Sequence, residues 1–132
     1  MNKRLLLTCL ILAGAALPAA AHHSFSMFDE TREVVLKGEV KEFQWSNPHT
    51  WIQLNVQDAS GKVVEWSIEG GSPNLLGRQG WKRNTLKAGD QLEVTINPLR
   101  DGQPGGSFVR AMFPDGRKLG RSQIPSASDA PR

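Results

Sequence analysis

Residues 51–69, WIQLNVQDASGKVVEWSIE, decide the fold. Two runs in this stretch, Trp51 to Asp58 and Val63 to Glu69, alternate apolar and polar side chains, which is typical of strands with one buried face. The segment Asp58-Ala59-Ser60-Gly61 between them predicts a hairpin turn. The two strands should therefore share one apolar face, whose members are Ile52, Leu54, Val56, Val64, Trp66 and Ile68.

Three further strands extend this pattern on both sides of the hairpin. Glu33 to Phe43 alternates in the same way, with Gly38 predicting a bend or a bulge. Gln91 to Asn97 forms a fourth run that Pro98 ends. A glycine-rich connection leads to a fifth run, Ser107 to Phe113, which is closed by Pro114-Asp115-Gly116.

A short helix is predicted between the third and fourth strands. Gly70-Gly71 ends the third strand, Ser72-Pro73 offers an N-cap with proline in the first helical position, and Gly80 provides a stop. Three strands, a short helix and two strands are the element order of an OB-fold. We therefore expect an all-β fold, a small five-stranded OB-like Greek-key barrel, although a sandwich or an open sheet capped by a helix has the same order.

The first 21 residues have the layout of a secretory signal peptide. Lys3 and Arg4 precede an apolar run from Leu5 to Leu17, and small residues suited to a cleavage site follow Pro18. The apolar run is shorter than the roughly 20 residues that span a bilayer. The pattern predicts export to the periplasm, with cleavage after Ala21 or after Ala20.

Removal of this segment leaves 111 residues, enough for one domain, which we expect at residues 22–119 with an N-terminal arm and a disordered tail at 120–132. The remaining chain contains fourteen Lys and Arg and thirteen Asp and Glu, and the positive and negative residues are interspersed along the sequence. Nucleic acid is not an expected partner, because phosphate backbones require a basic stripe. Cys9, the one cysteine, leaves with the signal peptide.

The chain's three histidines, His22, His23 and His49, are its metal-ligand candidates. If His22 becomes the N-terminus, its amine and ring nitrogen can chelate one ion, with His49 as a third nitrogen. If Ala21 is first, the amine, two amides and His23 suit square-planar Cu(II) or Ni(II). Both patterns favour copper. In the alternative, none of the histidines binds a metal: His22 and His23 are solvated, and His49 forms a hydrogen bond with a loop carbonyl.

Other side chains can support a ligand near His49. Met27 and Met112 are soft donors, and Trp51 is a possible π partner for an ion. By alternation Trp51 also lies on the outer strand face, where a tryptophan among polar residues is a common partner contact. That ligand or partner face comprises Trp51, Gln53, Asn55, Glu65 and Glu69, and its two glutamates can orient a ligand imidazole or remain plain surface carboxylates.

No catalytic motif is recognisable in the sequence. A nucleophile elbow and a phosphate-binding glycine loop are both missing, and the mature chain has no cysteine. We therefore predict that the protein is not an enzyme, with a small copper oxidoreductase using an N-terminal histidine as a remaining alternative.

The sequence resembles a family of short exported bacterial proteins of unknown function. The resemblance rests on A-H-H-S-F at Ala21 to Phe25, on Phe28-Asp29, on Leu36 to Val40, on Asn47-Pro48-His49 and on Gly89-Asp90. It implies export and a single domain but no activity. In architecture the chain is also similar to small periplasmic OB-fold copper carriers, but it lacks their paired methionines around a tryptophan, which favours a nitrogen-rich Cu(II) site.

These observations together predict a periplasmic binding or accessory protein with a copper site at His22, His23 and His49. Its expected partners are an unknown periplasmic protein or a small ligand, with no membrane span after processing. A metal-free adaptor that presents the Trp51, Gln53 and Asn55 face is the main alternative.

Overall fold

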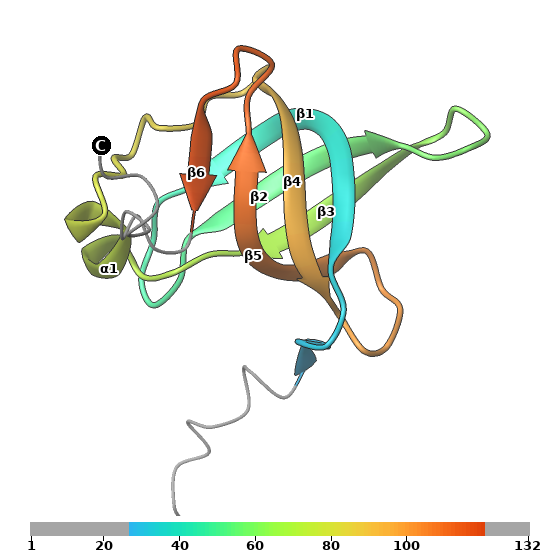
Figure 1. The fold of residues 1–132 in the computed structure, drawn as a ribbon, viewed down its shortest axis with the longest axis horizontal. Coiled ribbons are helices and arrows are strands. Elements are labelled where there is room, and N and C mark those ends of the chain that lie inside the picture. Colours follow the sequence, from blue (N-terminus) through green and yellow to red (C-terminus); the bar gives the residue numbers. More distant parts are fainter. Residues whose placement is uncertain (1–26, 121–132) are drawn as a thin grey trace, which may run out of the picture.

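The computed structural model describes residues 27–120 of the chain. They form six strands and one short helix (Figure 1): β1 (Val34–Gln44), β2 (Trp51–Gln57), β3 (Val63–Glu69), α1 (Pro73–Arg78), β4 (Gln91–Pro98), β5 (Gly105–Met112) and β6 (Lys118–Gly120). The strand order is β3-β2-β1-β4-β5-β6, and a parallel pairing of β3 with β5 closes the first five strands into a barrel. The predicted all-β, five-stranded barrel with one helix after its third strand is confirmed.

The central hairpin has the predicted turn and the predicted shared apolar face. Ile52 pairs with Ile68 and Leu54 with Trp66, so the apolar positions of β2 and β3 meet on the inner face. At the turn the Asp58 carboxylate accepts hydrogen bonds from the backbone N–H groups of Ser60 and Lys62, and Gly61 has a φ of 84°. The turn therefore uses aspartate and glycine in the roles that the sequence assigns to them.

Inward side chains of all five barrel strands form one core. It includes side chains with no exposed surface from β1, β2, β3 and β4, namely Val40, Leu54, Ile68, Val94 and Ile96. Trp81 and Leu86, from the segment after α1, are buried in the same cluster. In a closed barrel, the apolar face of each strand packs against side chains from the opposite wall. Five short strands are therefore enough to enclose a core.

Gly38 marks a close approach of strands, and the bulge predicted there lies elsewhere. Gly38 pairs with Val56 of β2 and with Leu92 of β4, whereas the register irregularity of β1 falls between Val40 and Glu42. A Cβ atom on Gly38 would overlap the backbone carbonyl of Asn55. The glycine is needed because the backbone of β2 leaves no room for a side chain at this position.

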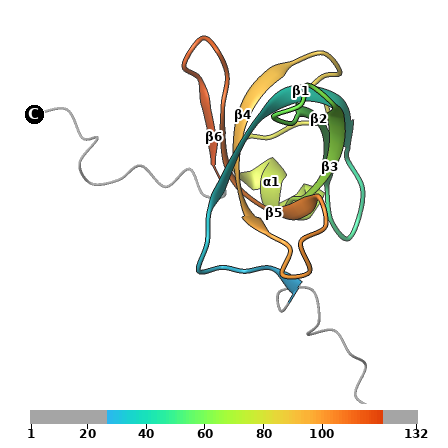
Figure 2. The ribbon, with the colours of Figure 1, turned by 90° about the vertical axis from the view of Figure 1, so that its right-hand side faces the viewer.

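The helix α1 lies across one end of the barrel (Figure 2). The Ser72 hydroxyl accepts a hydrogen bond from the Leu75 backbone N–H, Pro73 starts the helix, and Gly80 has a φ of 88°. Leu76 points into the core with 3% of its surface exposed. The predicted caps are therefore confirmed, and they orient the helix so that it covers this end of the core.

A sixth strand, β6, was not predicted. Gly116 and the bond from the Phe113 N–H to the Arg117 carbonyl form a tight turn, after which β6 pairs with Arg110 to Met112 of β5. β3 pairs with β5 only as far as Ser107, so the later part of β5 can pair with another strand. β6 extends to Gly120, the first residue of the segment expected to be a tail. A three-residue strand carries too little alternation to be recognised from sequence.

The outer face of β4 is also less exposed than alternation predicts. Thr95 and Asn97 are buried, and the Asn97 side chain donates a 2.8 Å hydrogen bond to the Arg32 carbonyl. The chain before β1 therefore covers this part of the barrel, anchored by the pairing of Phe28 with Leu99.

The expected signal peptide at residues 1–21 and nearly all of the expected tail lie outside the described residues. Within residues 27–120, no helix has both the length and the apolar character needed to cross a membrane.

Ser72→Ala should lower the free energy of unfolding by about 1 kcal/mol, because it removes the acceptor of the Leu75 N–H at the helix N-terminus. Urea unfolding followed by tryptophan fluorescence measures this change. Ser72→Asn is the control, since asparagine also caps helices, and it should retain most of the stability. Equal losses in both variants would contradict the capping role.

Candidate functional site

His49 lies at the entrance of β2, in a loop whose backbone is fixed on both sides. The Ser46 hydroxyl donates to the His49 carbonyl at 3.0 Å. The buried Thr50 donates from both its N–H and its hydroxyl to the Gly71 carbonyl, and its own carbonyl accepts from the Gly70 N–H. These bonds tie the start of β2 to the end of β3, so the Cα of His49 is held against that strand end.

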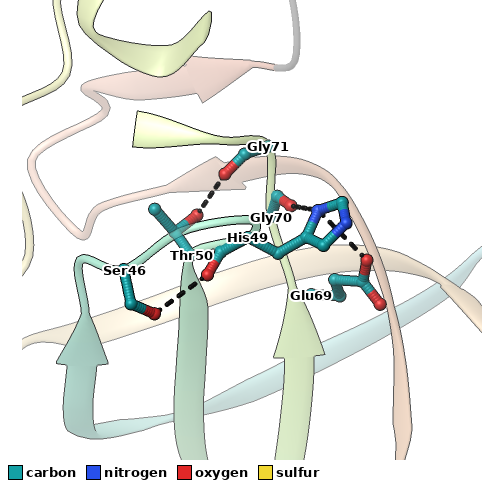
Figure 3. A network of polar contacts seen from close by, with 6 residues as sticks. All are labelled: Ser46, His49, Thr50, Glu69, Gly70 and Gly71. Atoms are coloured by element: carbon teal, nitrogen blue, oxygen red, sulfur yellow. Dashed lines mark hydrogen bonds and ion pairs between the residues drawn. The ribbon is translucent and has the colours of Figure 1, made fainter. Parts of the chain in front are cut away.

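The His49 imidazole is oriented through one of its two nitrogens (Figure 3). Nδ1 lies 3.3 Å from the Gly70 carbonyl oxygen and 3.2 Å from Oε1 of Glu69. Both neighbours are acceptors, so in the neutral ring Nδ1 carries the hydrogen and the lone pair is on Nε2. The His49 side chain is 34% exposed and that of Glu69 only 11%, so the orienting carboxylate is largely shielded while the ring remains accessible.

A cavity of about 290 Å³ adjoins the imidazole. Its walls are mainly apolar and come from distant parts of the chain: Phe28, His49, Glu69, Gly70, Gly71, Ser72, Leu75, Leu76, Ser107 and Phe108. The entrance of β2, the end of β3, the helix α1 and the start of β5 therefore meet at one site. Phe28 brings the beginning of the described chain to the same place.

The predicted partner face is assembled by the register of β2 and β3. Trp51 pairs with Glu69, and Asn55 pairs with Glu65. Gln53 lies between them opposite Ser67, so the five predicted residues share one outer face. Glu65 and Glu69 have different roles there, because Glu65 binds Lys41 at 2.6 Å while Glu69 contacts His49. The hydrogen bond that Lys41 donates to the Glu65 carboxylate raises the pKa of Lys41.

Neither of the two methionines lines the His49 cavity. Met112 lines a separate groove of about 770 Å³ with Glu93 and Phe113, and this groove shares no residue with the His49 cavity. Met27 is 48% exposed. His22 and His23 lie outside the described residues. Within residues 27–120, no three His, Cys, Asp or Glu side chains are grouped so that they could hold a metal ion.

Sequence reasoning missed the glycines that shape the site. A Cβ atom on Gly70 would overlap the hydroxyl of Thr50, and one on Gly71 would lie 3.3 Å from side-chain carbons of Leu75 and Leu76. Gly70 also supplies the carbonyl that holds Nδ1 of His49. The signal in the sequence is a Gly-Gly pair directly after a strand, but that pattern fits a simple strand end equally well.

Comparison with sequence families identifies the family to which this chain belongs. A family described as "Family of unknown function (DUF6152)" matches residues 10–108, which is most of the chain. The chain belongs to this family. Comparison with curated proteins and with solved structures gave no significant match. Membership in DUF6152 therefore assigns no activity to the chain.

Proposed function

We propose that this DUF6152 protein is an exported periplasmic binding or accessory protein that holds copper through His49 and the N-terminal histidines His22 and His23. The observation that carries the proposal is the orientation of the His49 ring, whose Nδ1 faces Glu69 and the Gly70 carbonyl while the lone pair is on Nε2. Histidines that bind metals commonly have this arrangement, because a carboxylate or carbonyl on one ring nitrogen makes the other a better ligand.

One histidine does not make a copper site, so further ligands have to come from the N-terminal segment. After cleavage behind Ala21, the new amine and the His22 ring can chelate one ion, and Nε2 of His49 adds a third nitrogen. After cleavage behind Ala20, His23 is the third residue and its imidazole completes a square-planar set with the amine and two amides. Phe28 supports the first arrangement, because it lies in the wall of the His49 cavity only a few residues after His22.

The periplasmic location is supported by the composition of residues 1–21, which have a basic start, a short apolar run and small residues at the expected cleavage position. A protein exported to the periplasm would bind copper outside the cytoplasm. Its mature chain also lacks thiols, which would otherwise compete with nitrogen ligands for the metal.

Replacement of His49 should weaken copper binding. We expect Glu69→Gln to raise the Kd for Cu(II) by about tenfold and His49→Ala to raise it by about 100-fold or more, because loss of the outer partner of a ligand histidine lowers metal affinity by roughly 10–100-fold. The measurement is a Cu(II) titration by isothermal calorimetry on exported protein whose N-terminus has been fixed by mass spectrometry. Glu65→Gln is the matched control, because Glu65 lies on the same face but binds Lys41.

Two outcomes separate the proposal from its alternatives. If correctly processed wild-type protein binds Cu(II) no more tightly than His49→Ala, the three-histidine site is refuted. If Glu65→Gln and Glu69→Gln weaken binding equally, the contact between Glu69 and His49 has no part in it.

A metal-free adaptor is the second candidate function, and the register of β2 and β3 favours it. Trp51, Gln53 and Asn55 form a continuous outer row opposite Glu69, Ser67 and Glu65, so a partner would meet an aromatic ring among polar groups. A periplasmic partner captured by the wild-type protein and lost with Trp51→Ala, while His49→Ala still binds it, would establish this function in place of copper binding.

A further inference from the structure

The cavity beside His49 lies where the described chain begins. The Met27 carbonyl accepts a 2.9 Å hydrogen bond from the Arg100 N–H, and the Asp29 N–H donates to the Pro98 carbonyl at 2.8 Å. Between them Phe28 pairs with Leu99 and is 4% exposed. The chain is therefore fixed against the connection from β4 to β5, and the described residues begin next to the cavity wall formed by Phe28.

The walls of this cavity favour an apolar occupant. Phe28, Leu76 and Phe108 present buried apolar side chains to it, and Leu75, which is 49% exposed, lies at its rim. Apolar cavities of roughly 150 Å³ already accommodate a benzene ring. At about 290 Å³ this cavity has room for an aromatic side chain and part of its backbone.

The sequence just before Met27 supplies one such side chain. From Ala21 to Ser26 the chain reads A-H-H-S-F-S, and Phe25 is its only large apolar residue. Phe25 is three residues from Phe28, a separation that an extended chain spans with at most about 11 Å. We propose that Phe25 inserts into the His49 cavity of its own chain and packs against Leu76 and Phe108.

This insertion goes beyond the proposed copper site, because it needs no metal. Burial of an aromatic ring against apolar walls is favourable by itself. It also has a consequence for the metal ligands, since it places His22 and His23 two or three residues from a ring held beside His49. The arm would then be ordered before an ion arrives, which lowers the entropic cost of assembling ligands from distant parts of the chain.

The proposal is tested on exported protein in the presence of EDTA, so that copper plays no part. We expect nuclear Overhauser effects between the Phe25 ring and the Leu76 methyl groups. Phe25→Ala should remove them and lower Tm by roughly 4–8 °C. Phe25→Leu, which keeps an apolar side chain of similar reach, should retain most of the stability, and Ser26→Ala is the matched control in the same segment.

A small apolar probe provides an independent measurement. Toluene should bind to Phe25→Ala, whose cavity is open, and bind much more weakly to the wild type, whose cavity is filled. Equal toluene binding by both proteins would overturn the proposal, as would unchanged Tm and Leu76 signals in Phe25→Ala. Overhauser effects seen only between differently labelled molecules would show that the arm of a second copy fills the cavity, and this also overturns insertion within one chain. Failure of copper binding would leave all these results unchanged.

Discussion

Gly38→Ala should lower the free energy of unfolding by about 3 kcal/mol or more, one of the two largest effects expected in this protein. The new Cβ would overlap the Asn55 backbone carbonyl and lie 3.1 Å from Cγ of Leu54, which has no exposed surface. Backbone cannot rotate away as a side chain can, so β1 and β2 would have to separate. Because Gly38 also pairs with Leu92, the strain reaches the ladder with β4.

Chemical unfolding and a thermal scan measure this loss, which corresponds to a fall in Tm of roughly 12 °C or more for a domain of this size. Gly77→Ala is the matched control, because a Cβ there meets nothing within 4 Å and the position is helical. Alanine should stabilise it by about 0.5–1 kcal/mol, since glycine is a poor helix former. The same sign of change in both variants would refute the close-approach explanation.

Trp81→Ala should cost about 3–5 kcal/mol, the range observed when large aromatic side chains are removed from cores. The Trp81 ring is 4% exposed and lies 5.4 Å from the ring of Phe108 in an edge-on arrangement and 6.0 Å from that of Phe43. Those partners come from β5 and β1, so the indole joins two barrel strands to the segment after α1. Loss of the indole would leave a cavity beside Phe108, which also lines the His49 site.

Trp51→Ala is the control for Trp81→Ala, since it deletes the same atoms from the outer face and should cost much less. Trp81→Phe refines the test. The Trp81 indole N–H is buried and has no hydrogen-bond partner among residues 27–120, so phenylalanine removes an unpaired donor while keeping a ring. The stability of Trp81→Phe should be much closer to that of the wild type than to that of Trp81→Ala. Urea unfolding of the three variants gives the comparison, and equal losses for Trp81→Ala and Trp51→Ala would contradict the assigned core role.

The local features of the fold could be predicted because each depends on neighbouring residues. Asp58 and Gly61 form their turn through bonds within five residues, and Ser72 caps the helix that starts at the next residue. The alternation of Ile52 and Leu54 likewise defines a buried strand face without knowledge of what covers it. Local hydrogen bonds and side-chain periodicity are properties of short segments, and the sequence contains them fully.

The candidate site was predicted only in part, for the opposite reason. His49 and Glu69 were both recognised as candidates, but their contact depends on the register of β2 against β3, which places Glu69 opposite Trp51. Met112 is equally plausible by residue type, yet it faces a different groove. Residue chemistry identifies which side chains can bind a ligand, whereas strand register decides which of them meet.

The sequence by itself therefore determined an all-β chain with a capped helix after its third strand and one apolar face along each strand, and it supplied three histidines as candidate nitrogen ligands. The tertiary structure alone decided that Gly38 must lack a side chain, that Trp81 belongs to the core, and that the entrance of β2, the end of β3, α1 and Phe28 share one cavity. The physical reason is barrel closure. Pairing of β3 with β5 joins segments about 40 residues apart, and contacts of that range leave no periodic signal in the chain.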